Sequence, residues 1–251
     1  MKIFDAHFHI IDYRYPVVEN NGYFPPEFTL DNYHQATSSF ELVGGAVVSG
    51  SFQAFDQTYL TASLSELGEG FFGVANIPVD MSDEGLGFLY QRQVGAVRFN
   101  LKRGGSESID HLPYLSDKLY EKYGWHTELY LDSKQLVDLA PTLRKIKRFS
   151  IDHLGLSSAG LKELYHWVEQ GVKVKATGFG RIDFDPIPVM QQIHRINPTA
   201  LMFGTDLPST RAKIPFSMVD VQRVTAHFDQ AAQEQIFYRN ALSWYGKSHK
   251  E

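Results

Sequence analysis

The chain has 251 residues, 43% of them hydrophobic, so it is long enough to bury a large core as a single domain. Its formal net charge of −5 excludes a broadly basic surface of the kind that binds nucleic acid. Because it contains no cysteine, disulfides and thiolate nucleophiles are excluded, and any metal must bind to histidine, carboxylates or water. No segment approaches the roughly 18 consecutive apolar residues of a membrane-spanning helix. We therefore expect a cytoplasmic protein that binds neither nucleic acid nor membranes.

The first predicted strand, residues 2–8, runs into the sequence DAHFHI. Because successive side chains of a strand point to opposite faces, we expect Asp5, His7 and His9 to share one face. Two imidazoles and a carboxylate together are unusual in an ordinary core, so they are candidates for chemistry. The next segment includes YRYPVVENNGYFPPEF, a long loop rich in tyrosine and turn residues, and loops of this kind often shape substrate pockets.

Short β-rich runs alternate with helical patterns along the rest of the chain. Further strands are predicted at 42–50, 70–77, 94–101, 126–131, 148–153, 172–178 and 200–206, with helical periodicity at 133–147, 158–171 and 188–197. This alternation predicts parallel βαβ units that close into a (β/α)8 TIM barrel, with the active site at the carboxyl ends of the strands. An open doubly wound sheet is the alternative, but no G-x-G-x-x-G follows the first strand. No repeat or linker divides the chain, so residues 1–251 are predicted to form one domain.

Polar residues gather where the predicted strands end. After the two first-strand histidines come Ser49 and Ser51, Arg98 and Asn100, Glu128 and Tyr130, Asp152 and His153, Lys175 and Thr177, and Asp206. In a barrel these side chains can point inward, where a charge must be paired, hydrogen-bonded or metal-bound. We expect Lys175 to form an ion pair with Glu128 or Asp152.

Four stretches carry a resemblance to a known family: DAHFHI at 5–10, SIDHLG at 150–155, VKATGFGR at 174–181 and LMFGTDLPST at 201–210. In this order they resemble the signature stretches of the amidohydrolase superfamily. GAVRFNL at 95–101 is similar to the fourth-strand motif of its amidohydrolase 2 branch, which includes hydrolases resembling 2-pyrone-4,6-dicarboxylate lactonase. A lone H-x-H would be weak evidence for this family, whereas the four stretches in this order are strong evidence for the resemblance.

The resemblance implies a hydrolase with His7, His9 and Asp206 at its centre and His153 beside them. In metal-dependent members the first-strand histidines and the last-strand aspartate bind a divalent ion, for which zinc is the leading expectation here. Members with two metals also need a bridging group on strand four and a histidine on strand five. Strand four offers arginine and asparagine instead, and His126 lies at the start of strand five, so two metals are not expected. Lactonase-like members are thought to work without metal, which leaves one ion or none.

Both schemes use Asp206 to accept a proton from water, and the histidines to polarise the carbonyl. Asp206 could instead cap the turn before Pro208. Arg98 and Arg181 fall where a guanidinium could hold a substrate carboxylate, although structural salt bridges explain them equally well. Further substrate-binding candidates are Tyr130 and Ser49. For Arg103 and Arg211, surface salt bridges are the favoured interpretation.

We expect hydrolysis of a small carboxylated lactone or a related cyclic ester or amide. A decarboxylase-like relative acting on an aromatic acid is the nearest alternative. A metal oxygenase with two histidines and one carboxylate, or a barrel without catalytic activity, also stays open. The sequence does not decide whether the chain forms a homo-oligomer.

Overall fold

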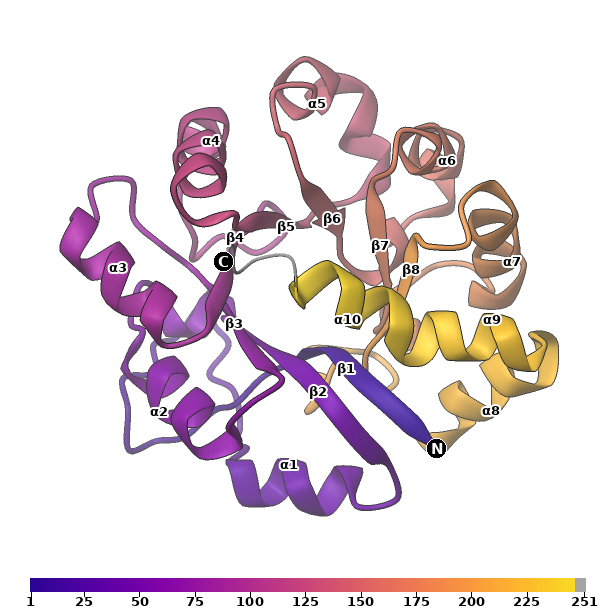
Figure 1. Ribbon diagram of the computed structural model, residues 1–251, viewed down its shortest axis with the longest axis horizontal. Helices are drawn as coiled ribbons and strands as arrows, with labels where there is room; N and C mark the ends of the chain where they lie inside the picture. Colours follow the sequence, from indigo (N-terminus) through magenta and orange to yellow (C-terminus); the bar gives the residue numbers. More distant parts are fainter. Residues whose placement is uncertain (247–251) are drawn as a thin grey trace.

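The computed structural model describes residues 1–246, in which eight parallel strands form a ring (Figure 1). The strands are β1 (Lys2–Phe8), β2 (Glu41–Val48), β3 (Phe71–Ala75), β4 (Val94–Asn100), β5 (His126–Tyr130), β6 (Phe149–Ile151), β7 (Lys173–Ala176) and β8 (Leu201–Phe203). Each pairs with the next in sequence order. The ring closes between β8 and β1, where the amide of Asp206 donates to the carbonyl of His7 at 2.7 Å and the amide of His9 donates to that of Leu207 at 2.8 Å. The predicted TIM barrel is confirmed.

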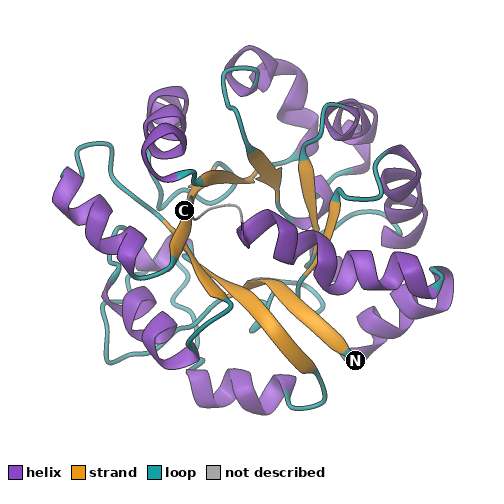
Figure 2. Ribbon diagram, viewed as in Figure 1, coloured by secondary structure: helices purple, strands orange, loops and turns teal. Residues whose placement is uncertain are grey.

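Helices surround the ring on its outside, except for the last one, which lies across the opening of the ring (Figure 2). They are α1 (Leu30–Thr37), α2 (Thr58–Leu67), α3 (Asp83–Gln91), α4 (Leu112–Tyr123), α5 (Leu136–Leu143), α6 (Leu161–Glu169), α7 (Pro186–Ile196), α8 (Met218–His227), α9 (Gln230–Glu234) and α10 (Asn240–Tyr245). The periodicity at 133–147 and 158–171 corresponds to α5 and α6, each preceded by a 3-10 turn, and that at 188–197 corresponds to α7. No helix within residues 1–246 is long and apolar enough to cross a membrane.

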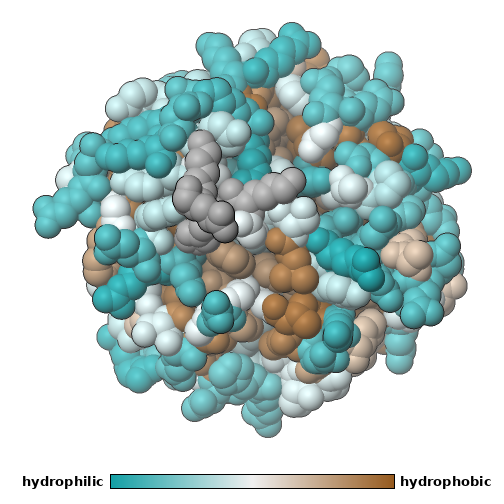
Figure 3. Space-filling view, in the orientation of Figure 1, coloured by the Kyte–Doolittle hydropathy of each residue, from teal (hydrophilic) through white to brown (hydrophobic). Residues whose placement is uncertain are grey.

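The apolar core has two parts. The larger lies between the strands and the surrounding helices, while a smaller one fills the inside of the barrel around Phe4, Ala6 and Met202. Trp244 and Tyr245 of α10 close this inner cluster, because α10 lies across the opening of the ring at the end where the chain begins (Figure 1). Figure 3 shows this face, where hydrophobic side chains are exposed among polar ones near α10. The strands end on the opposite face.

A β-bulge in β1 corrects one expectation about the first motif. The pairing with β2 advances from Asp5 to Phe8 on one strand while it advances only from Gly45 to Val47 on the other. The extra residue changes which face the following side chains occupy. Asp5 points outward, where it accepts a hydrogen bond from the Tyr33 hydroxyl of α1 at 3.2 Å. The expectation that Asp5 shares a face with the two histidines is therefore wrong.

Candidate active site

Four polar side chains from three strand ends meet at the carboxyl end of the barrel. His7 lies in β1 and His9 directly after it, His153 lies after β6, and Asp206 lies after β8. The Nε2 atoms of His7 and His9 lie 3.9 and 4.0 Å from Oδ1 of Asp206, and the rings of His7 and His153 are 4.8 Å apart. All four residues are buried. The structure thus brings the predicted catalytic residues together.

The backbone turns sharply where His153 and Asp206 leave their strands. Their φ angles are +51° and +60°, in a region that side chains other than glycine rarely adopt. The His153 ring shares a hydrogen bond with the Thr177 hydroxyl at 2.7 Å. Gly178 passes close beside it, and a Cβ there would lie 2.7 Å from Nδ1 of His153 and 2.9 Å from Cδ of Arg181. Only glycine fits between these two side chains.

The buried histidines are held neutral at neutral pH. Burial, followed by repulsion from Arg98, lowers the pKa of His9 to about 3. Burial, then the charge of Lys175, places the pKa of His7 well below its usual value, and burial does the same for His153. The proton of His9 is located by its partner, because Nδ1 lies 2.7 Å from the Val48 carbonyl, which can only accept. The Nε2 atom of His9 therefore presents a lone pair to the site.

Two carboxylates of the site are paired with arginines. Burial raises the pKa of Asp206, and Arg181, whose Nε donates to Oδ2 at 2.6 Å, offsets this only in part. Burial would also raise the pKa of Asp152, but Arg98 and then Lys175 hold it below the usual value. Arg98 donates to Oδ2 of Asp152 at 3.0 Å. The ion-pair interpretation of both arginines is confirmed, although both also line the cavity described below.

A third ion pair lies deeper in the barrel. Lys175 donates to Glu128 in a short contact, which confirms the predicted ion pair. Glu128 also accepts from the Tyr245 hydroxyl at 2.5 Å and contacts Nε2 of His126 at 3.2 Å. Burial works against the charged form of Glu128, but Lys175 and His126 outweigh it and lower its pKa to about 2. This network connects the site to the plug, by which we mean Trp244 and Tyr245 of α10 at the opposite end of the barrel.

A small cavity of about 30 Å³ opens onto these residues. It is lined by His9, Gly50, Ser51, Phe52, Arg98, Asn100, Arg103, Tyr130, His153, Arg181, Thr210 and Arg211. Ser49 does not line it, because its hydroxyl bonds with the Tyr59 hydroxyl at 2.8 Å while its carbonyl accepts from Arg98 at 2.7 Å. Its neighbour Ser51 lines the cavity instead.

A larger hollow of about 280 Å³ lies beside this cavity. The two share Arg103, Tyr130, Arg181 and Arg211 as lining residues. Within residues 1–246 neither Arg103 nor Arg211 forms a salt bridge, so the surface-pair interpretation of these two is wrong. The Arg211 guanidinium lies 4.4 Å from the centre of the ring of Tyr23, which belongs to the tyrosine-rich loop. This contact holds Arg211 at the mouth of the site, the region where the two hollows share their lining residues.

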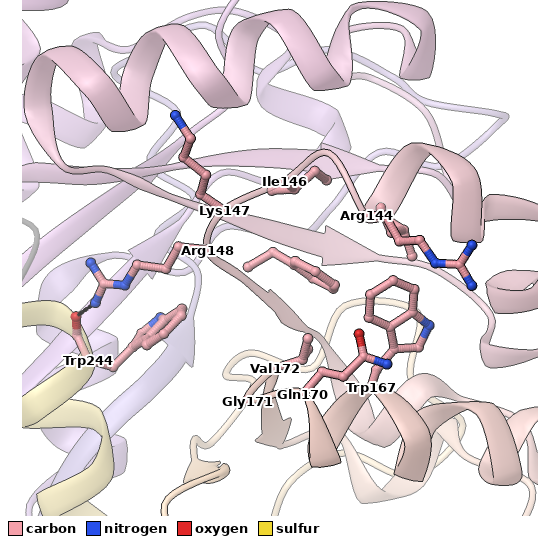
Figure 4. A pocket seen from close by; sticks show the side chains of 11 residues that line it. Arg144, Ile146, Lys147, Arg148, Trp167, Gln170, Gly171, Val172 and Trp244 are labelled. Atoms are coloured by element: carbon pink, nitrogen blue, oxygen red, sulfur yellow. Dashed lines mark hydrogen bonds between the residues drawn. The ribbon is translucent and has the colours of Figure 1, made fainter.

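Another cavity, of about 220 Å³, lies at the opposite end of the barrel (Figure 4). Its lining includes Arg144, Lys147 and Arg148 together with Trp167 and Trp244, but no histidine or carboxylate. Arg148 stacks on the Trp244 ring at 4.1 Å and donates to its carbonyl (Figure 4). The described lining of this cavity carries no acid–base pair, so the cluster at the carboxyl ends of the strands is the candidate site.

The central cluster has a donor set that could bind one divalent ion. Nε2 of His7 and Oδ1 of Asp206 have no hydrogen-bond partner among the described residues, and Nε2 of His9 has a free lone pair. These atoms lie within 4.8 Å of one another. Tetrahedral zinc ligands would be roughly 3.3 Å apart, so the cluster would contract on binding. A second possible set, His7, Asp152 and His153, shares His7 with the first.

The barrel thus carries a His-x-His pair at the end of its first strand, a histidine after the sixth and an aspartate after the eighth, which is the arrangement that the resemblance to the amidohydrolase superfamily implied. The amidohydrolase family model matches residues 4–247, nearly the whole sequence. The chain therefore belongs to the amidohydrolase 2 family, and the resemblance in its motifs is confirmed.

Solved structures share the fold at low sequence identity. A protein from Agrobacterium tumefaciens, in an apo structure, is 18% identical with a TM-score of 0.84, over 97% of this chain and 95% of that chain. A "probable 2-pyrone-4,6-dicarboxylic acid hydrolase" from Acinetobacter baumannii, with citric acid bound, is 21% identical with a TM-score of 0.80, over 98% and 100% of the two chains. A proposed hydrolase of the same name from Pseudomonas putida is 20% identical with a TM-score of 0.81, over 99% and 98%. No curated protein matches the sequence.

Proposed function

We propose that the protein hydrolyses a small carboxylated lactone, or a related cyclic ester or amide. The observation that carries this proposal is the placement of Asp206, whose free Oδ1 faces two neutral histidines across gaps of 3.9 and 4.0 Å. A water in such a gap could donate a hydrogen bond to Oδ1 of Asp206 and also hydrogen-bond to a histidine on the other side. Arg181 holds the other carboxylate oxygen, so it orients Oδ1 toward the histidines.

In the proposed reaction, Asp206 takes a proton from water while the water oxygen attacks the carbonyl carbon of the substrate. The carbonyl oxygen becomes negative and is stabilised by N–H groups of the site. The ring C–O bond then breaks, and Asp206 returns its proton to the departing oxygen. The product carries a new carboxylate and a new hydroxyl group. An amide substrate would lose its C–N bond in the same way, with the proton passing to nitrogen.

A divalent ion bound by the central cluster would polarise the carbonyl and lower the pKa of its water. The roles of the surrounding residues are the same in either case. Asp206 still accepts and returns the proton, and the arginines still provide positive charge at the mouth of the site.

The charge at the mouth supports an anionic substrate. Arg103 and Arg211 line both hollows and lack carboxylate partners within the described chain. Tyr130 also lines both hollows, and its ring lies 5.0 Å from that of His153. Guanidinium groups bind carboxylates through paired hydrogen bonds. The bound citric acid in the similar Acinetobacter structure supports the same substrate class.

A panel of lactones with and without a ring carboxylate tests the proposal. We expect turnover of carboxylated lactones, measured through the protons that hydrolysis releases. Turnover of their uncharged methyl esters should be much slower. Carbon dioxide release from aromatic acids, without lactone hydrolysis, would instead establish the decarboxylase alternative. No turnover in either assay would contradict both enzymatic assignments.

A further inference from the structure

The carboxylates at the centre of the barrel already have cationic partners. Three ion pairs link Asp206 to Arg181, Asp152 to Arg98, and Glu128 to Lys175, and no side chain among them is more than 8% exposed. The three negative and three positive charges cancel. A divalent ion would add two positive charges to a balanced, buried group, where unpaired charge is costly. The donor atoms thus have a suitable arrangement for a metal, whereas the charges do not favour one.

Lys175 is the member of these pairs that reaches a histidine of the site. Its Nζ lies 3.4 Å from Nδ1 of His7, while it also bonds to Glu128 and lies 3.9 Å from Oδ1 of Asp152. A lysine ammonium has three hydrogens to donate and no lone pair. The nitrogen that faces it must therefore accept, and the single proton of a neutral imidazole then lies on Nε2.

We propose that Lys175 is a positioning residue that holds His7 with its proton on Nε2, and that this excludes a divalent ion from the cluster of His7, His9 and Asp206. His9 is held the other way, because its Nδ1 donates to the Val48 carbonyl and its Nε2 presents a lone pair. The two histidines then differ in function. His7 donates to the substrate carbonyl, and His9 accepts from the attacking water beside Asp206. These roles rest on the proposed hydrolysis, whereas the placement of the proton does not.

One other arrangement competes with this assignment. Nδ1 of His7 also lies 3.6 Å from Oδ1 of Asp152, which has no hydrogen-bond partner among the described residues. If Nδ1 carried the proton and donated it there, Nε2 would be free to bind a metal, with Asp152 supporting the ligand from behind. The two arrangements differ in the position of one proton. The shorter distance to Lys175 and the balanced charges favour the proton on Nε2.

Nuclear magnetic resonance on the unmodified protein decides between them. In ¹⁵N-labelled wild-type protein, two-bond ¹H–¹⁵N spectra distinguish the two neutral forms of each histidine, and the His7→Gln variant identifies the His7 signals. We expect Nε2–H for His7 and Nδ1–H for His9, which serves as the internal reference. A proton on Nδ1 of His7 would overturn the proposal.

Metal titration provides a second readout that does not depend on turnover. We expect metal-free wild-type protein to bind cobalt or zinc far below one ion per chain, and Lys175→Met to bind cobalt at least tenfold more tightly, with the absorption of histidine-bound cobalt. Lys173→Met is the matched control, because Lys173 lies on the same strand and bonds to Thr199 outside the site. Its affinity should equal that of the wild type. Stoichiometric binding by the wild type that Lys175→Met does not strengthen would overturn the proposal.

Lys175→Met leaves Glu128 buried without its partner and could fail to fold. The double variant Lys175→Met/Glu128→Gln removes both charges and keeps the balance, so it should show the same gain in cobalt affinity. The outcomes also separate this inference from the proposed function. A protein that hydrolyses no lactone but shows Nε2–H on His7 contradicts the function alone. An active lactonase with Nδ1–H on His7 contradicts only the role of Lys175.

Discussion

The two ends of the barrel are built from the same strands but hold opposite kinds of side chain. At the amino-terminal end, the inner side chains are mostly apolar, with His126 as an exception, and α10 seals the opening with stacked rings, such as Tyr245 on Phe4 at 5.2 Å between ring centres. At the carboxyl end, the inner side chains are histidines and ion pairs, and the chain turns through strained conformations at His153 and Asp206. Strain and buried charge reduce stability, so the apolar end must compensate for them.

This contrast predicts that substitutions at the two ends act on different properties. Changes at the carboxyl end should reduce turnover with little effect on folding, whereas changes at the plug should reduce stability with little effect on turnover per folded molecule. Within residues 1–246, the network from Tyr245 through Glu128 to Lys175 links the two ends, so substitutions in it should affect both stability and turnover.

The largest expected effect is that of Asp206→Asn at the carboxyl end. The amide cannot accept the proton from water, so turnover should fall by about 10² to 10⁴. Steady-state kinetics on a lactone that the wild type hydrolyses gives the ratio, and circular dichroism checks the fold. Asp220→Asn is a suitable control, because burial also raises the pKa of Asp220 but it lies on α8, away from the site. Near-normal turnover in Asp206→Asn would remove Asp206 from the mechanism and direct attention to Asp152.

At the opposite end, Tyr245→Ala should mainly destabilise the fold. It removes a fully buried ring from the plug, which typically costs about 3 to 5 kcal/mol. Tyr245→Phe keeps the ring and removes only the hydroxyl that donates to Glu128, for a cost of about 1 to 3 kcal/mol. Urea denaturation measures both. If Tyr245→Phe lowered turnover as strongly as Asp206→Asn, the separation of the two ends would not hold.

Acid should weaken the fold through buried histidines at both ends. The pKa is lowered to about 3 for His9 and about 4 for His126, both chiefly by burial, while the unfolded chain binds these protons near pH 6.5. Their stabilisation is complete above pH 6.5 and is lost as pH falls toward those values. Asp5, whose pKa burial raises to about 6, acts in the opposite direction and adds stability as pH falls from about 6.

Between pH 7.5 and 5.5 we therefore expect His9, His126 and Asp5 together to lower the free energy of unfolding by about 2 kcal/mol, since each histidine contributes about 1.4 kcal/mol per pH unit below 6.5. His7 and His153 should add to this fall, because burial also lowers their pKa. Urea denaturation at the two pH values measures this difference. His126→Gln should reduce the dependence on pH. A stability that rose on acidification would show that the carboxylic acids outweigh the histidines.

The barrel and the central residues could be predicted because their signals are local. The strands are short runs rich in β-forming residues, and His153 and Asp206 lie within motifs that directly follow strands. The outward turn of Asp5 could not be predicted, since a bulge depends on how β1 pairs with its neighbour. The partner of Glu128 on α10 was also missed, because nothing in the sequence near Tyr245 shows that the last helix lies across the barrel. Local patterns specify elements, whereas the pairing of distant side chains needs the fold.

The smallest expected effects on turnover are those of two arginine substitutions at the carboxyl end, which should differ from each other. Arg103 lines the mouth without an acidic partner in the described chain, so Arg103→Met should raise KM for a carboxylated substrate by about tenfold and leave kcat nearly unchanged, as expected for uniform binding. Arg181→Met should differ, because Arg181 holds the Asp206 carboxylate and lowers its pKa against the effect of burial. Without it the pKa of Asp206 rises further.

Asp206, the proposed base, would then stay protonated up to a higher pH. The acid limb of the kcat/KM profile should therefore move to higher pH in Arg181→Met and stay in place in Arg103→Met. The profiles of both variants and the wild type, measured on one substrate, make the comparison. Uncharged lactones provide the control, since their KM should not respond to Arg103→Met. If both variants changed only KM, then Arg181 would act on the substrate alone, and its bond to Asp206 would be released before water is activated.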